Sequence, residues 1–194
     1  MKRIAVFCGS SAGASEVYGQ GAAELGKELA ARKLTLVYGG SSVGLMGTVA
    51  DTVLAEGGEA IGVLPTFLEN REIAHKNLSE LYIVDSMHER KAKMAELADG
   101  FVVLPGGAGT MDEFFEIFTW AQLGLHRKPC GLLNTNRYYD PLITMINHMA
   151  DEQFLQEKFR SMTLSDTTPK GLLDQFLSYE PPAVKTFMTT KQQV

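Results

Sequence analysis

The sequence predicts an α/β protein of the Rossmann-like, doubly wound type, with a parallel sheet of six or seven strands and helices on both faces. Two observations carry this prediction. Short runs rich in valine, isoleucine and leucine alternate with longer stretches of helical periodicity, and glycine- or serine-rich turns follow several of the apolar runs. Short apolar runs without a polar face are typical of strands that helices cover on both sides.

Six apolar runs are predicted to be strands, and five longer stretches are predicted to be helices. The strands are expected at residues 4–8, 34–38, 60–64, 81–84, 101–104 and 131–133. The helices are expected at about residues 15–31, 44–57, 87–98, 110–124 and 139–150. A seventh strand could be added at an edge by residues 162–164, before a last helix over residues 168–179 that Pro181 and Pro182 end.

The bulk properties indicate one globular domain. A chain of 194 residues suits a single Rossmann-like domain, expected over residues 1–180, followed by a C-terminal tail over residues 181–194. The net charge of -5 argues against binding to nucleic acid polymers or to anionic membranes. The apolar start of the chain is cut short by Gly9, and no stretch reaches transmembrane length, so we expect a cytoplasmic protein without membrane partners.

The cysteines and histidines predict neither a disulfide nor a metal site. Cys8 and Cys130 fall in or next to predicted buried strands, which fits inert thiols in a reducing compartment. Cys8 as a nucleophile would need a neighbouring base that the local sequence does not provide. The four histidines lack metal-ligand spacing, so we predict no metal and no cofactor.

The turns after the strands predict a ligand site at the carboxyl edge of the sheet. In doubly wound sheets these turns lie together and bind ligands. Glycines and serines occupy residues 9–11 and 39–42, but neither turn has the G-x-G-x-x-G pattern, and no P-loop lysine is present. A pocket for a nucleoside monophosphate therefore fits better than a dinucleotide or triphosphate site.

The most informative turn is Pro105-Gly106-Gly107-Ala108-Gly109-Thr110, which follows a predicted strand and opens a helix. Its glycines let backbone N–H groups approach an anion, and the helix N-terminus attracts negative charge. Glu113 is expected in the first helical turn, where a carboxylate indicates chemistry rather than phosphate binding alone. A structural alternative stays open, since Thr110 and Glu113 have the spacing of a capping box.

A second helix at the same edge brings in an arginine. Arg90 shares a helical face with Met87, Met94 and Leu97, which faces the sheet. A half-buried arginine needs an anionic partner, either a bound phosphate or a carboxylate such as Glu113. A purely structural ion pair at the sheet edge is the alternative. The next residue, Lys91, is of a type that usually lies on a solvated face.

Together, Met87-x-x-Arg90-Lys91 and the run Pro105-Gly106-Gly107-x-Gly109-Thr110-x-x-Glu113 resemble the signature of the LONELY GUY (LOG) family of cytokinin-activating enzymes. The similarity covers roughly residues 3–180. It extends through Cys8-Gly9-Ser10-Ser11, Tyr38-Gly39-Gly40, Gly44-Leu45-Met46-Gly47, residues 119–124, Asn134 and Tyr138-Tyr139.

The resemblance implies a phosphoribohydrolase that cuts the N-glycosidic bond of cytokinin riboside 5'-monophosphates, and in many members of AMP, releasing the free base and ribose 5-phosphate. It implies Arg90 and Glu113 as the catalytic pair and a homodimer whose active sites are completed near the interface. The residues implied to contact the nucleotide are Glu72, Arg90, Lys91, Gly107, Ala108, Gly109, Thr110, Met111, Asp112, Glu113 and Thr119. For Glu72 and Thr119 the resemblance is the sole indication.

The proposed chemistry leaves the role of Glu113 open. Loss of the base creates positive charge on the ribose, and a carboxylate can attack the sugar, activate a water or act as a counter-charge. The apolar helix around Phe114, Phe118 and Trp120 fits either the core or a subunit contact. The alternative function is a non-catalytic carrier of a nucleotide or of molybdenum cofactor. A pyridoxal-dependent decarboxylase is not supported, because no Schiff-base lysine with an orienting carboxylate is found.

Overall fold

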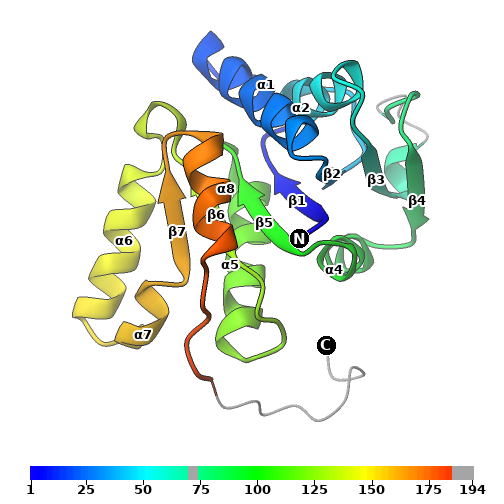
Figure 1. The fold of residues 1–194 in the computed structure, drawn as a ribbon. Helices are drawn as coiled ribbons and strands as arrows, with labels where there is room; N and C mark the ends of the chain where they lie inside the picture. The colour runs from blue at the N-terminus through cyan, green and yellow to red at the C-terminus, as the bar shows by residue number, and fades with distance from the viewer. Residues whose placement is uncertain (70–73, 185–194) are drawn as a thin grey trace.

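The computed structural model describes residues 1–69 and 74–184. Its strands are β1 (Arg3–Phe7), β2 (Thr35–Tyr38), β3 (Ala60–Pro65), β4 (Glu80–Val84), β5 (Gly100–Val103), β6 (Cys130–Leu133) and β7 (Thr163–Asp166). Its helices are α1 (Glu16–Ala31), α2 (Gly44–Ala55), α3 (Thr66–Glu69), α4 (Met87–Leu97), α5 (Ala108–Gln122), α6 (Asp140–Asp151), α7 (Glu157–Arg160) and α8 (Pro169–Leu177). A 3-10 turn, η1 (Thr135–Arg137), follows β6 (Figure 1).

The seven strands form one parallel sheet in the order β4-β3-β2-β1-β5-β6-β7. The predicted Rossmann-like fold and the seventh strand are thereby confirmed. After β4 at one edge, the chain crosses back to place β5 beside β1, with Val6 opposite Val102 and Phe7 opposite Val103. The strand order thus reverses between β1 and β5, and ligands bind at such a switch point in open α/β sheets.

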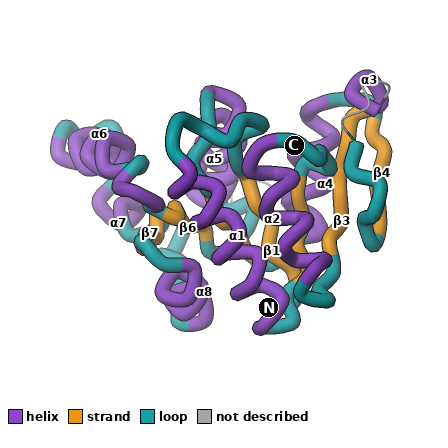
Figure 2. Tube along the Cα trace, turned by 90° about the horizontal axis from the view of Figure 1, so that it is seen from above, coloured by secondary structure: helices purple, strands orange, loops and turns teal. Residues whose placement is uncertain are grey.

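Two hydrophobic cores lie on the two faces of the sheet. Side chains of α1, α2 and α8 make one core with Ile4 and Val6 of β1, while α4, α5 and α6 make the other with Ala5 and Phe7. This alternation follows from the two-residue period of a strand. Figure 2 shows α1 and α8 on one side of the row of strands and α5 on the other.

The edge strand β4 differs from the prediction that all strands are buried on both faces. Leu81 and Ile83 are 38% and 42% exposed, whereas Tyr82 and Val84 pack against the core on the α4 side. An edge strand has a neighbour on one side only, and its apolar run reads like that of a central strand. The elements α3, α7 and η1 were not predicted, because three or four residues are too few to show a helical period.

Within residues 1–69 and 74–184, no helix is long and apolar enough to cross a membrane. Residues 181–184 form neither helix nor strand. The rest of the predicted tail, residues 185–194, lies outside the described residues.

Candidate active site

The glycine turn leads into α5 two residues earlier than the sequence predicted. The N-cap is Gly107 and the first helical residue is Ala108, so Thr110 is the third helical residue and Glu113 lies in the second turn. Gly107 has no side chain to cap the helix, and the capping-box interpretation of Thr110 and Glu113 is wrong. The first N–H groups of α5 therefore have no partner from a capping side chain, which leaves them to bind an anion.

A cavity of about 490 Å³ lies at the carboxyl ends of β1, β2, β3 and β5. Its polar lining gathers the predicted catalytic pair and the start of α5: Ser10, Gly39, Ser41, Arg90, Gly107, Ala108, Gly109, Thr110, Asp112 and Glu113. Its apolar lining comes from Cys8, Val43, Met46, Leu64, Leu68 and Met87. The cavity thus has the mixed character of a site that takes an anionic group at one part and an apolar group at another.

Arg90 and Glu113 form a buried ion pair inside this cavity. Arg90 Nη1 lies 3.1 Å from Glu113 Oε1, and their side chains are 11% and 9% exposed. Burial raises the pKa of Glu113 to about 7, and the nearby charge of Arg90 opposes this rise. Among the described residues Arg90 Nε has no hydrogen-bond partner, so the guanidinium retains a donor beyond its pairing with Glu113.

Room for Arg90 is made by Gly39, which follows β2. A Cβ on Gly39 would collide with Arg90 Nη2 and would come within 3.0 Å of Met46 Sδ. The guanidinium thus packs directly over the backbone of the second turn, opposite the carboxylate of α5. Gly39 therefore fixes the side of the cavity on which Arg90 lies, and no larger residue fits there without moving it.

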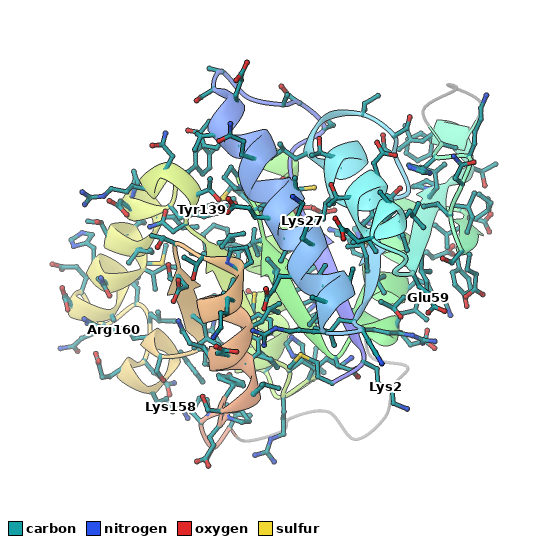
Figure 3. All side chains as sticks on the ribbon, turned by 45° about the horizontal axis from the view of Figure 1, so that its top comes forward. Lys2, Lys27, Glu59, Tyr139, Lys158 and Arg160 are labelled. Atoms are coloured by element: carbon teal, nitrogen blue, oxygen red, sulfur yellow. The ribbon has the colours of Figure 1, made fainter. Side chains whose placement is uncertain are left out.

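Two adjacent tyrosines hold the glycine turn from behind. Tyr139, labelled in Figure 3, is buried and its hydroxyl donates to Leu104 O at 2.6 Å. Tyr138 Oη donates to Gly106 O at 2.7 Å. Asn134, at the end of β6, accepts from Tyr139 N at 2.7 Å and so anchors the pair. These bonds fix the carbonyl groups of Leu104 and Gly106, on either side of Pro105, and thereby the direction of the N–H groups that follow them.

Three predicted site residues that the structure describes, Lys91, Met111 and Thr119, do not line the cavity. Lys91 Nζ lies 3.0 Å from Asp112 Oδ2 and 2.9 Å from Glu116 Oε2, with its side chain only 8% exposed. Met111 is half-buried against the core below α5, and Thr119 is exposed on that helix, six residues beyond Glu113. Glu72 lies outside the described residues. The nucleotide contacts of these four side chains stay predictions.

Several lining residues were not assigned to the site from the sequence. Ser10, Gly39 and Ser41 belong to turns that were expected at this edge, so their position after β1 and β2 was the available signal. Leu64 in β3 and Leu68 in the short helix α3 had no such signal, because their apolar side chains are also typical of core residues.

Neither thiol nor metal chemistry has support in the described part of the chain. Burial raises the pKa of Cys8 far above its usual range and that of Cys130 to about 12, so both are inert thiols. In residues 1–69 and 74–184, no three histidine, cysteine, aspartate or glutamate side chains are grouped so as to hold a metal ion.

The sheet, the glycine turn and the cavity define a Rossmann-like α/β protein with a ligand cavity at the switch point of its sheet and a buried carboxylate in that cavity. Comparison with known proteins identifies the family. The family described as "Possible lysine decarboxylase" matches residues 46–176. The chain belongs to this family and, within it, to the cytokinin riboside 5'-monophosphate phosphoribohydrolases of the LOG family, which are enzymes acting on N-glycosyl bonds.

Three relatives carry that assignment. A protein of Rhodococcoides fascians named cytokinin riboside 5'-monophosphate phosphoribohydrolase is 52% identical over 84% of this chain and 83% of its own. An Arabidopsis thaliana protein with the same name is 49% identical over 93% of this chain and 83% of its own. A probable member from Oryza sativa subsp. japonica is 45% identical over 100% of this chain and 79% of its own.

Solved structures with the same fold include proteins of a different kind. The molybdenum cofactor binding protein of Rippkaea orientalis aligns with a TM-score of 0.70 at 20% identity, over 91% of this chain and 96% of its own. A molybdenum cofactor carrier protein from Chlamydomonas reinhardtii aligns with a TM-score of 0.68 at 20% identity, over 92% and 99%. At this identity the likeness concerns the fold alone.

The packing of Arg90 on Gly39 gives a first testable prediction. Gly39→Ala should push the guanidinium away from Glu113, and the pKa of Glu113 should then rise above about 7 because its stabilising cation is withdrawn. The titration of the Glu113 carboxyl can be followed by carbon NMR of the labelled protein. Gly19→Ala is the control, because a Cβ there meets no atom within 4 Å. An unchanged Glu113 titration in folded Gly39→Ala would contradict the prediction.

Proposed function

We propose that this protein hydrolyses the N-glycosidic bond of cytokinin riboside 5'-monophosphates and of AMP, releasing the base and ribose 5-phosphate. One observation carries the proposal: the buried Arg90–Glu113 pair lies in a cavity whose wall is the start of α5. The names of the relatives support the substrate class. The geometry supports the division of roles among the residues of this chain.

The 5'-phosphate binds at the start of α5. Gly107, Ala108 and Gly109 are exposed to the cavity, and Thr110 is the third helical residue. Backbone N–H groups and the positive end of the helix dipole together attract a phosphate. The fixed carbonyls of Leu104 and Gly106 keep the turn from rearranging when the ligand binds. Binding energy gained at the phosphate then positions the sugar for reaction.

The base occupies the apolar part of the cavity. Met46, Leu64, Leu68 and Met87 offer surface to a purine and to an apolar substituent at its N6 position. Methionine side chains adapt to ligands of different shape, which fits acceptance of both a substituted adenine and AMP.

Glu113 carries the chemistry. As the C1'–N9 bond breaks, positive charge develops on the ribose and negative charge on the purine. An ionised Glu113 stabilises the cationic sugar, and a water supplies the oxygen that joins C1' and the proton that leaves with the base. The three roles of nucleophile, general base and counter-charge all require the ionised carboxylate. Arg90 keeps that carboxylate oriented through their ion pair.

A non-catalytic carrier is the alternative function, and the shared fold of the molybdenum cofactor proteins is its support. A carrier needs the glycine turn but has no use for a buried carboxylate beside a bound anion, because the like charges repel. The Arg90–Glu113 pair therefore favours the enzyme. Lysine decarboxylation also lacks support. A pyridoxal-dependent enzyme needs a lysine that forms a Schiff base with the cofactor. The pKa of Lys91 is raised instead, because its ion pairs with Glu116 and Asp112 outweigh the effect of its burial.

We also propose that the protein works as a homodimer in the cytoplasm. Phe114, Ile117 and Phe118 are buried in the core, but Thr119 is exposed on the same helix. The resemblance implies that Thr119 contacts a nucleotide, but Thr119 does not line the cavity of its own subunit. A nucleotide bound in the cavity of a second subunit would explain such a contact. The two buried free thiols fit a reducing compartment.

The catalytic proposal is tested with Glu113→Gln. The wild-type protein should release free base from AMP and from isopentenyladenosine monophosphate, and the variant should be slower by a factor of about 100 or more, because a neutral amide stabilises the cationic sugar poorly. Base release is measured by chromatography. Glu96→Gln, an exposed substitution on α4, is the control and should retain activity. Nucleotide binding without turnover by the wild type would instead support a carrier.

The raised pKa of Glu113 predicts the pH dependence of hydrolysis. Because the ionised form is active and its pKa is about 7, kcat/KM should fall about tenfold per unit as the pH drops below 7. An unperturbed glutamate would keep its activity down to about pH 4.3. The pH profile of kcat/KM, with the phosphate titration of the substrate measured separately, distinguishes the two. An acid limb near pH 4 would contradict the prediction.

The dimer is tested by sedimentation velocity. The protein should sediment with a mass twice that of the 21.2 kDa chain. Thr119→Arg should lower both the dimer fraction and the activity, since burying a long charged side chain at an interface is costly. Thr144→Arg, an exposed site on α6, is the control. A fully active monomer would overturn the dimer proposal and leave the hydrolysis proposal standing.

A further inference from the structure

Lys91 lies behind the catalytic pair rather than in the cavity. It reaches from α4 to α5 and pairs with Asp112 and Glu116, at 3.0 and 2.9 Å. These two carboxylates flank Glu113, one residue before it and three residues after it on α5. Lys91 also follows Arg90 directly in the sequence. The same stretch of α4 therefore makes ion pairs with three carboxylates of α5.

We propose that Lys91 is a positioning residue, whose ammonium pairs with both Asp112 and Glu116, offsets part of their charge and clamps α4 to α5 so that Glu113 stays paired with Arg90 and remains able to ionise. This inference rests on the proposed function only where activity is the readout. It departs from the role that the LOG resemblance implies for Lys91, which is contact with the nucleotide.

The charges around Glu113 show why a clamp is needed. The groups that act on the Glu113 carboxylate are Arg90 and Lys91 from α4, Asp112 and Glu116 from α5, and Cys8 after β1. Cys8 is a neutral thiol, so the cluster holds two cations and three carboxylates. Without Lys91, Arg90 would be the remaining cation of this cluster, and it would face the carboxylates of Asp112, Glu113 and Glu116. Glu113 would then favour the protonated form, which is inactive in hydrolysis.

The burial of Lys91 makes this interaction stronger than a surface ion pair. Its side chain is 8% exposed and that of Glu116 is 24% exposed, whereas that of Asp112 is 65% exposed, so the pair with Glu116 is the shielded one. Burial alone would lower the pKa of Lys91, but the pairs with Glu116 and Asp112 outweigh it, so Lys91 stays charged at neutral pH. The charge of Lys91 acts on Glu113 from a buried side chain, so salt screens it little.

The test is the titration of Glu113 in Lys91→Met. Removing the cation should move the Glu113 midpoint upward by about one pH unit, as expected for a charge several ångströms away in a partly buried site. Carbon NMR of labelled carboxyls measures the midpoint, with the Glu113 signal assigned from Glu113→Gln. The acid limb of kcat/KM should move by the same amount. Lys91→Arg, which keeps the charge, should restore both.

Two further variants make the experiment decisive. Lys93→Met removes another ion-paired lysine of α4, 3.4 Å from Glu96, and should leave the Glu113 midpoint in place. Glu116→Gln removes a carboxylate and should move the midpoint downward, which tests the same electrostatics if Lys91→Met does not fold. An unmoved midpoint in Lys91→Met or in Glu116→Gln, or an equal shift in Lys93→Met, would overturn the inference. If the shifts occur in a protein that hydrolyses no nucleotide, the proposed function fails and the inference stands.

Discussion

The ion pair between Arg90 and Glu113 is the interaction on which the rest of the site depends. Two charges with side chains about one-tenth exposed lose most of their hydration, and the pKa of Glu113 near 7 records that cost. Such a pair persists only where its geometry is held from several sides. Gly39 leaves space for the guanidinium, and the glycine turn brings α5 to the same sheet edge. The pair is thus a product of the topology, because α4 and α5 precede and follow β5 in the chain.

The residues around this pair have two kinds of role: some fix the backbone of the glycine turn, and others balance the charge of the carboxylates. Tyr138 and Tyr139 bond to carbonyl groups of the glycine turn and act on its shape, whereas Lys91 acts on the carboxylates of α5. Neither group needs to touch a nucleotide to matter. The C=O and N–H groups of one peptide bond lie in the same plane. Hydrogen bonds that hold the carbonyl groups therefore also hold the direction of the N–H groups that would bind a phosphate.

The sequence predicted what depends on strand order and local pattern, and it missed what depends on distant packing. The strands, six of the helices and the meeting of Arg90 with Glu113 followed from alternation and from the convergence of strand ends. The packing of Gly39 depends on the path of a side chain 51 residues away, which no local pattern contains. For Lys91 the residue type favoured a solvated face and the resemblance implied a nucleotide contact, and a helical period does not reveal that carboxylates of α5 pair with it. The early start of α5 was missed because the spacing of Thr110 and Glu113 favoured a helix that begins at residue 110, and only the turn geometry selects Gly107 as the N-cap.

The same fold serves molybdenum cofactor carriers and phosphoribohydrolases, so the fold does not determine the chemistry. In the function proposed here, the phosphate binds where the strand order reverses, at the start of α5. A hydrolase needs one more feature, which is a carboxylate that ionises at neutral pH although it is buried beside a bound phosphate. A lone buried glutamate would stay protonated there, and an exposed one would be too strongly hydrated to stabilise a cationic sugar. The pairing with Arg90 resolves this conflict, because it favours the ionised carboxylate while Glu113 stays buried.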